Sequence, residues 1–193
     1  TAPNTGILAK VRGQAERLSR TAMELLEFAR PLRPSVHDVD VCELLDRTLF
    51  FVERRAAEQK VELRRHYASE LPPAAVDPDL MKQVFLNILL NGLQAMPNGG
   101  ALDLVVALDG AATLQVTISD QGMGIPPENM PRLFTPFFST REAGTGLGLY
   151  VAKQLMETQR GEIRVESRLG HGTSFTLRMP ARAARDDVCG APL

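Results

Sequence analysis

The first part of the chain carries apolar residues at alternating spacings of three and four. Over residues 7–30 this pattern predicts one long helix with a heptad seam, interspersed with Arg and Glu. Such a seam needs a partner helix, as in half of a helical hairpin or a dimer stalk; the alternative is a helix lying on its own domain. Pro31 and Pro34 end the predicted helix and begin an extended linker. The seam consists of Leu8, Val11, Ala15, Leu18, Ala22, Leu25 and Ala29.

The rest of the chain mixes helical and strand periods. The predicted helices are residues 41–59, 78–96 and 148–158. The predicted strands are residues 61–67, 101–108, 113–119, 162–167 and 173–179, with a short apolar segment at 74–76. Asp77 and Pro78 form a typical helix start, with Asp as N-cap and Pro at the first helical position. A Pro- and Gly-rich stretch at 121–145 interrupts the pattern, and the tail after Pro180 is expected to be disordered.

Composition excludes several classes of protein. The 193 residues include 22 Lys and Arg against 23 Asp and Glu, a net charge of −1, which argues against a nucleic-acid partner. Two cysteines and three scattered histidines supply neither a disulfide framework nor a metal site built from His and Cys. The sequence has no apolar run near the ~20 residues of a membrane span and no signal peptide. We therefore expect a cytoplasmic protein, which is compatible with a soluble fragment of a larger, membrane-anchored parent.

The predicted helix at 78–96 has an unusual polar face. Gln83, Asn87 and Asn91 follow one another at i, i+4 and i+8, with Gln94 nearby. Asn is a mediocre helix former, so two Asn residues one turn apart beside an apolar run suggest a buried polar site. An amide oxygen can ligate Mg²⁺. The alternative is an ordinary polar face that is half exposed to solvent.

Two glycine-containing segments add candidate chemistry. Asp120-Gln-Gly-Met-Gly124 follows a strand, where the carboxylate can accept the exocyclic amine of an adenine while the glycines let the backbone approach a flat ring; a plain turn is the alternative. Gly144-Thr-Gly-Leu-Gly-Leu149 opens a helix and offers free N–H groups to phosphate. It has neither the Rossmann spacing nor the Lys of a Walker A loop. Arg141 can reach a terminal phosphate, or is simply a solvated charge.

The connection between these two segments is unusually long. It spans 23 residues between Asp120 and Gly144 and contains four prolines. Connections of this length are uncommon unless they serve a function. Three of the eight Phe residues fall inside it, which favours the hinge and anchor of a lid over a plain piece of core. They are Phe134, Phe137 and Phe138.

In this order and at this spacing, the segments resemble the catalytic and ATP-binding domain of bacterial two-component sensor histidine kinases, in the GHKL ATPase superfamily. The resemblance covers about residues 36–180. Residues 7–34 resemble the second helix of the family's dimerisation and phosphotransfer hairpin. The matching motifs are an N box (83–95), a first glycine box (120–126), an F box (133–140), a second glycine box (144–149) and a closing strand (172–180).

The resemblance implies an α+β fold, a two-layer α/β sandwich of the Bergerat type with a mixed sheet, helices on one face and one long helix in front. The implied domains are residues 1–34, part of the hairpin; 35–180, the catalytic and ATP-binding domain; and 181–193, a disordered tail. The implied activity is transfer of the γ-phosphoryl group of ATP, with Mg²⁺, to a histidine, for relay to the receiver domain of a response regulator. The intact parent is expected to form a homodimer through the hairpin.

The same resemblance implies roles for individual residues. Asn91 would coordinate Mg²⁺, with Asn87 close to the same shell as a catalytic group, and Arg141 would assist at the γ-phosphate. Asp120, supported by Thr173, would bind the adenine amine. The other nucleotide-binding positions would be Gly122 and Gly124 at the adenine, and Gly144, Thr145, Gly146, Leu147 and Gly148 in the second glycine box; Phe134 and Phe138 would couple the lid to the helical stalk.

The sequence departs from the family in lacking its phosphoacceptor, a His followed by an acidic residue on the first hairpin helix. His37, His66 and His171 fall in a linker, a strand and a turn, so we expect the chain to begin at the hairpin tip and not to phosphorylate itself. Thr158-Gln-Arg-Gly161 replaces the more usual His-Gly pair.

Two alternatives to the kinase function stay open. One is an ATPase of the gyrase or mismatch-repair type, which is disfavoured because Asn87 stands where such enzymes carry a carboxylate base. The other is a non-enzymatic nucleotide-binding module.

Overall fold

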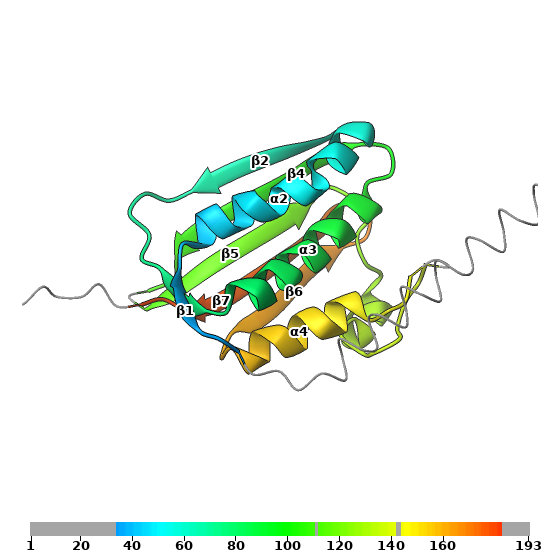
Figure 1. The fold of residues 1–193 in the computed structure, drawn as a ribbon. Helices are drawn as coiled ribbons and strands as arrows, with labels where there is room; N and C mark the ends of the chain where they lie inside the picture. The colour runs from blue at the N-terminus through cyan, green and yellow to red at the C-terminus, as the bar shows by residue number, and fades with distance from the viewer. Residues whose placement is uncertain (1–33, 111, 142–143, 183–193) are drawn as a thin grey trace, which may run out of the picture.

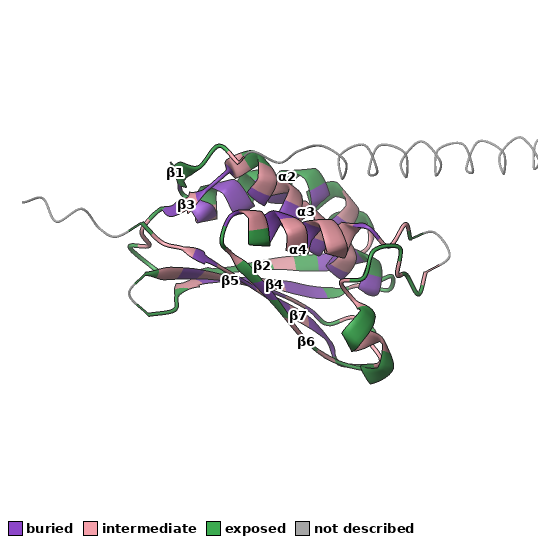
Figure 2. Ribbon diagram, turned by 90° about the horizontal axis from the view of Figure 1, so that it is seen from below, coloured by how far each residue is buried: buried purple, intermediate pink, exposed green. Residues whose placement is uncertain are grey.

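The structure, a computed structural model, describes residues 34–110, 112–141 and 144–182. These residues form two layers, a five-stranded sheet and three α-helices that lie on one face of it (Figure 1 and Figure 2). The predicted two-layer α/β sandwich is therefore confirmed. The long helix expected over residues 7–30 lies outside the described residues. Of the tail expected to be disordered from residue 181, Ala181 and Arg182 instead donate backbone hydrogen bonds to Ala112 and Pro73, and the residues from 183 lie outside the described residues.

The sheet is mixed, as predicted. Its order is β2-β4-β5-β7-β6, with β2 and β4 parallel and the other neighbours antiparallel. A second pairing joins β1 (His37–Val39) to β3 (Ala74–Val76). His37 therefore lies in a short strand instead of the unpaired linker expected from the sequence, because β3 supplies a backbone partner. The five sheet strands are β2 (Val61–Tyr67), β4 (Gly100–Leu108), β5 (Thr113–Asp120), β6 (Glu162–Arg168) and β7 (Gly172–Pro180).

Two of the three helices begin directly after a capping Asp. The three are α2 (Val41–Glu58), α3 (Pro78–Ala95) and α4 (Gly148–Thr158). At α2, Asp40 Oδ1 accepts the N–H of Glu43 at 3.0 Å. At α3, Asp77 Oδ1 accepts the N–H groups of Asp79 and Leu80 at 3.0 and 3.2 Å. Both carboxylates satisfy N–H groups that a helix start leaves unpaired. Within the described ranges, no helix is long and apolar enough to cross a membrane.

The core lies between the helices and the sheet. Along β5, Leu114, Val116 and Ile118 face the helices and are buried, while the residues between them are partly exposed on the open face. Helix α3 packs Phe85 and Leu89 into the same core with no exposed surface. Burying an aliphatic or aromatic side chain of this size contributes ~1.5–3 kcal/mol. This packing fixes α3 on the sheet and leaves its polar face available at the surface.

A buried polar joint connects α3 and α4. Gln159, directly after α4, is 5% exposed. Its Oε1 accepts the N–H of Asp77 at 2.6 Å, and its Nε2 donates to the carbonyl of Leu155 at 3.1 Å. The second carboxylate oxygen of Asp77 accepts the N–H of Ser35 at 2.6 Å. Gln159 therefore holds the end of α4 against the start of α3.

Replacing Gln159 with Leu should lower the free energy of unfolding by about 1–3 kcal/mol, because the Asp77 N–H stays buried without an acceptor. Urea denaturation measures this. The matched control is Gln154→Leu, within α4, because the Gln154 side chain bonds only the exposed Glu157 carboxylate at 3.2 Å among the contacts the structure gives it. The control should change stability by less than ~0.5 kcal/mol. Equal losses in the two variants would contradict a special role for the joint.

Candidate nucleotide site

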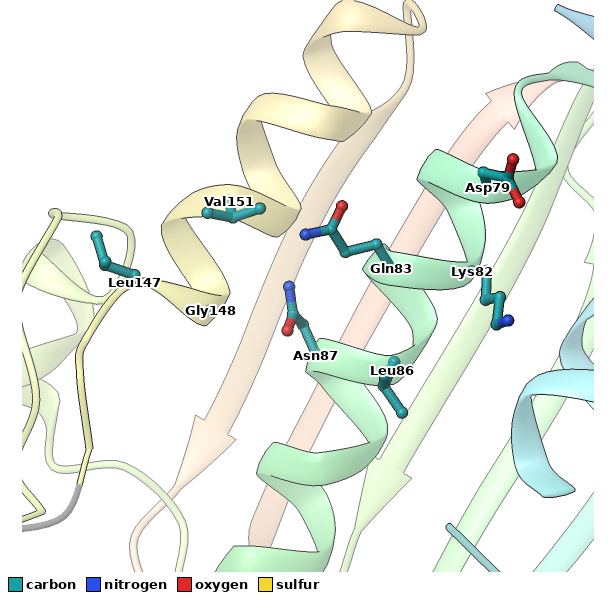
Figure 3. A pocket seen from close by; sticks show the side chains of 8 residues that line it. All are labelled: Asp79, Lys82, Gln83, Leu86, Asn87, Leu147, Gly148 and Val151. Carbon is teal, nitrogen blue, oxygen red and sulfur yellow. The ribbon is translucent and has the colours of Figure 1, made fainter. Parts of the chain in front are cut away.

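The polar face of α3 lies against the start of α4. Gln83 and Asn87 point from α3 toward α4 and the segment before it (Figure 3). They line a cavity of about 440 Å³ between the two helices. A Cβ on Gly148 would lie 3.6 Å from Asn87 Oδ1, so the second glycine box closely approaches the N box. The other lining residues are Asp79, Lys82, Leu86, Leu147 and Val151.

One turn further along α3, the amide oxygen of Asn91 faces the Arg141 guanidinium. Its Nδ2 donates to the backbone carbonyl of Asn87 at 3.0 Å. Its Oδ1 accepts from Arg141 Nη1 at 3.4 Å, and the same Arg141 nitrogen donates to Gln94 Oε1. The structure therefore brings together two residues, Asn91 and Arg141, that the sequence predicted at one site. Gln94, which the sequence places near the same face, is the third member of this contact.

Asp120 is a buried carboxylate at the end of β5. It is 7% exposed, and its Oδ1 accepts the N–H of Gly122 at 2.8 Å. Burial raises the pKa of Asp120, and this is the largest effect; the backbone N–H groups of Gly122 and Thr173 and the charge of Arg141 oppose it. A charged group held in such an environment is characteristic of functional sites. At the position predicted to bind adenine, the glycine-box motif is therefore accompanied by a carboxylate whose pKa is raised.

Gly92 is a site residue that sequence reasoning missed. A Cβ at this position would lie 2.7 Å from Leu102 Cδ1 and 4.0 Å from Asp120 Oδ2. The absence of a side chain therefore lets α3 approach the sheet directly beside the Asp120 carboxylate. A lone Gly inside a strongly helical pattern was the available signal, because it costs helix stability and usually has a packing reason.

Thr173 lies opposite Asp120 and is linked to a second missed residue, Ser167. Asp120 and Thr173 are register partners in the β5–β7 pair, and Thr173 is 6% exposed. The Oγ atoms of Ser167 and Thr173 are 2.9 Å apart. Ser167 Oγ also donates to the carbonyl of Gly172 at 2.9 Å and accepts the N–H of Ile125 at 2.8 Å. Ser167 therefore connects the closing strand to the first glycine box. Nothing in the alternating pattern of β6 distinguished this Ser from an ordinary surface residue.

Two glycines are required by backbone conformation and close packing. Gly124 has φ +68°, and a Cβ there would lie 2.2 Å from the carbonyl oxygen of Arg168. Gly146 has φ +70°, and a Cβ there would lie 2.5 Å from the backbone of Phe137. Gly122 does not adopt positive φ; its constraint is contact with Ala95, 2.6 Å from a would-be Cβ. These contacts are with protein, so the roles of Gly122 and Gly124 at an adenine stay predictions.

The second glycine box ends at an uncapped helix start. Leu147 is 2% exposed and anchors the segment, while no side chain hydrogen-bonds to cap α4 at this position. Thr145 Oγ1 accepts the N–H of Leu147 at 3.4 Å. Gly144 donates its N–H to the carbonyl of Arg141 at 3.2 Å. A helix start of this kind has N–H groups and a positive dipole end that suit phosphate.

The F box is only partly buried. Phe134 packs against the core, and Lys153 Nζ of α4 lies 5.6 Å from its ring centroid. Phe138 lies under the Arg132 guanidinium at 4.4 Å. Phe137 is 62% exposed with φ 64°. The stalk to which Phe134 and Phe138 are predicted to couple falls in residues 1–33, outside the described residues. Within the described residues, Phe134 couples the loop to α4.

The candidate site therefore has two neighbouring parts. The 440 Å³ cavity belongs to the part at Asn87 and Gly148. Asp120 and Thr173 form the other part, outside the lining of that cavity. Arg141 connects them, because its side chain bonds Asn91 while its charge acts on Asp120. A mixed sheet with an Asn-bearing helix facing a glycine-rich loop defines the class of Bergerat-type ATP-binding domains.

Comparison with known proteins supports this class. Residues 76–183 match the family of histidine kinase-, DNA gyrase B- and HSP90-like ATPases. The sensor histidine kinase ZraS of Escherichia coli K12 is 36% identical over 177 residues, which cover 92% of this chain and 38% of that protein. Sporulation kinase E of Bacillus subtilis is 33% identical over 173 residues, 89% of this chain and 23% of that protein. The chain thus spans less than two fifths of the length of these curated relatives.

Solved structures show the same fold. Full-length ShkA in complex with AMPPNP has a TM-score of 0.81 and 25% identity, covering 95% of this chain and 40% of that chain. The mycobacterial sensor histidine kinase MprB has a TM-score of 0.68 and 28% identity, covering 77% of this chain and 99% of that chain. The chain belongs to the histidine kinase-, DNA gyrase B- and HSP90-like ATPase family, and its ATPase domain is of the sensor histidine kinase type.

Proposed function

We propose that this chain binds ATP together with Mg²⁺ and transfers the γ-phosphoryl group to a histidine on a separate helix, for relay to the receiver domain of a response regulator in the cytoplasm. The observation that carries the proposal is the meeting of Asn91 and Arg141 beside the buried Asp120–Thr173 pair. The family match and the sensor-kinase relatives support it. In this proposal, residues 35–180 are the catalytic and ATP-binding domain, and residues 1–34 are part of a dimerising hairpin.

The base end of the site suits adenine. The Asp120 carboxylate accepts hydrogen bonds only, so it would accept the exocyclic amine of adenine, with the Thr173 hydroxyl beside it. The carbonyl at the equivalent position of guanine would face the carboxylate and be repelled. We therefore assign ATP, and not GTP, as the nucleotide.

The phosphate end suits a metal-bound polyphosphate. Asn91 Oδ1 already accepts from a guanidinium cation, and amide oxygen is a ligand type that Mg²⁺ accepts, so the residue fits the metal. Mg²⁺, when bound, would neutralise the charge of the phosphates. Arg141 would contribute a second positive charge at the γ-phosphate, and the start of α4 at Gly148 would offer backbone N–H groups.

Asn87 argues against ATP hydrolysis as the main reaction. It lies next to Asn91 on α3 and faces Gly148 across the cavity. A neutral amide cannot remove a proton from water as a general base. The chain therefore suits positioning of a phosphoryl group for an external acceptor better than activation of a water molecule.

The histidines of this chain are poor acceptors. His37 lies in β1 and its Nε2 is 3.0 Å from Ser35 Oγ, whereas His66 lies in β2 and His171 in the turn before β7. None lies on a helix, where a phosphoacceptor of this family would be presented. The acceptor in this proposal is therefore a histidine on a separate helix.

The test is incubation with labelled ATP, alone and with a supplied helical hairpin of the sensor-kinase family that carries a histidine on its first helix. We expect acid-labile, base-stable label on the supplied hairpin and none on this chain. Replacing the acceptor histidine of the hairpin should remove the label. Label on this chain that disappears with His37, His66 or His171 would show that the phosphoryl group goes elsewhere.

A further inference from the structure

The Arg141 side chain is held by α3 through two amide oxygens. Its Nη1 donates to Gln94 Oε1 and to Asn91 Oδ1, the latter at 3.4 Å. The two acceptors are three residues apart on one helix, so they present their oxygens on the same face. Both are neutral groups, whereas Arg keeps its charge in proteins. The guanidinium is therefore bound by acceptors weaker than the phosphate oxygens of a nucleotide.

We propose that Gln94 holds Arg141 over Asn91 and thereby sets the affinity for nucleotide, because Arg141 must leave Gln94 and Asn91 before a metal and its phosphates can bind there. This inference rests on the proposed function, in which Asn91 Oδ1 is the metal ligand. A guanidinium and a Mg²⁺ ion cannot both occupy the space in front of that single oxygen. The Gln94–Arg141 contact therefore competes with the bound nucleotide.

The backbone around Arg141 indicates that the side chain alone has to move. Ser139 Oγ accepts the Arg141 N–H and donates to its carbonyl, both at 3.1 Å. The N–H of Gly144 donates to the same carbonyl at 3.2 Å. The two Ser139 bonds hold the main chain of Arg141 at both its N–H and its carbonyl. The guanidinium can then swing from Gln94 to a phosphate about a fixed backbone.

The surroundings make this exchange reversible. Arg141 is half-buried, and its Nη1 makes the two contacts with Asn91 and Gln94. Gln94 itself is exposed, and its contact with Arg141 is open to solvent on one side. An exposed hydrogen bond of this kind can be broken at modest cost, which is what a competing contact requires.

The experiment is a double-mutant cycle on the whole chain, with calorimetric titration of Mg²⁺-ATP. Gln94→Leu, which keeps the volume but removes the acceptor, should tighten Mg²⁺-ATP binding about fivefold, the size expected for one hydrogen bond to a charged group at an exposed position. Arg141→Ala should weaken binding. In the Arg141→Ala background, Gln94→Leu should have no further effect, because there is nothing left to release. Gln115→Leu, on the open face of the sheet, is the matched control and should bind as the wild type.

A second readout follows the side chain itself. In the absence of nucleotide, Gln94→Leu should shift the NMR signal of the Arg141 Nε–H toward its position in the Mg²⁺-ATP complex. An unchanged affinity in Gln94→Leu, or the same change in both backgrounds, would overturn this inference while leaving the proposed function intact. A wild-type chain that binds no Mg²⁺-ATP would overturn both.

Discussion

Replacing Asp120 with Asn should lower the affinity for ATP by about 50-fold or more, while the fold stays intact. The variant places a donor where the adenine amine also donates, and it loses a charged hydrogen bond, a combination worth ~2–3 kcal/mol. The carbonyl of the new amide can still accept the Gly122 N–H, which keeps the turn after β5. Calorimetric titration with Mg²⁺-ATP and Mg²⁺-GTP measures the change, and discrimination against GTP should shrink.

The same substitution should change how stability depends on pH. Burial raises the pKa of Asp120 from its ordinary value of 3.8, so the folded protein binds the proton more tightly than the unfolded chain does. The contribution of this group is then fully present below pH 3.8 and is lost as the pH rises through the pKa of folded Asp120. Asp120→Asn removes that loss. The free energy of unfolding of the variant, relative to the wild type, should therefore increase across this window.

Paired denaturation curves at a series of pH values above 3.8 test whether Asp120→Asn gains stability relative to the wild type as the pH rises. Asp103→Asn, on the open face of the sheet, is the control, since it removes a carboxylate that lies at a partly exposed position. Equal affinities of the wild type for ATP and GTP would show that Asp120 does not recognise the base. A relative stability of Asp120→Asn that falls as the pH rises would contradict the raised pKa.

The elements that the sequence predicted best have strong local determinants. Helix α3 follows from Asp77 and Pro78 at its start, and β5 follows from the regular alternation of apolar and polar residues along it. Both are short-range signals, so the single sequence contains them. The short strand at His37 was missed because three residues carry too little periodicity, and its partner at Ala74–Val76 is distant in the chain.

The site divides in the same way. Asn91, Asp120 and Arg141 could be named because their motifs are local in sequence, and the structure gathers them. Ser167 and Gln159 could not, because each acts through contacts with residues far along the chain: Ser167 with Ile125, and Gln159 with Asp77. A side chain that bridges distant backbone groups has no signature in its own neighbourhood. Gly92 is intermediate between the two groups. A Gly inside a predicted helix is visible in the sequence, but the sequence does not show which residues the helix approaches at that point.

The Asn91→Ala variant should lose affinity for Mg²⁺-ATP by about 30-fold, since a metal ligand that is also aligned by a hydrogen bond contributes ~2 kcal/mol. Its Nδ2 bond to the Asn87 carbonyl fixes the direction of the Oδ1 atom, so the wild-type oxygen is aimed before any ligand arrives. Binding of ATP in the presence of a chelator should change much less, because the oxygen acts on the metal and not on the base. Titrations with and without Mg²⁺ separate the contribution of the metal to ATP affinity from that of the base.

Asn87→Ala is the matched control for this prediction. It removes the neighbouring amide one turn earlier on the same face of α3 while keeping the carbonyl that Asn91 bonds. We expect a smaller loss of Mg²⁺-ATP affinity than in Asn91→Ala, and little dependence of that loss on the metal. The structure supports this order, because Asn91 Oδ1 faces the Arg141 cation while Asn87 Oδ1 faces the start of α4 at Gly148. Intact Mg²⁺-ATP affinity in Asn91→Ala, or a larger loss in Asn87→Ala, would move the metal away from Asn91 and leave the polar face of α3 with a structural role.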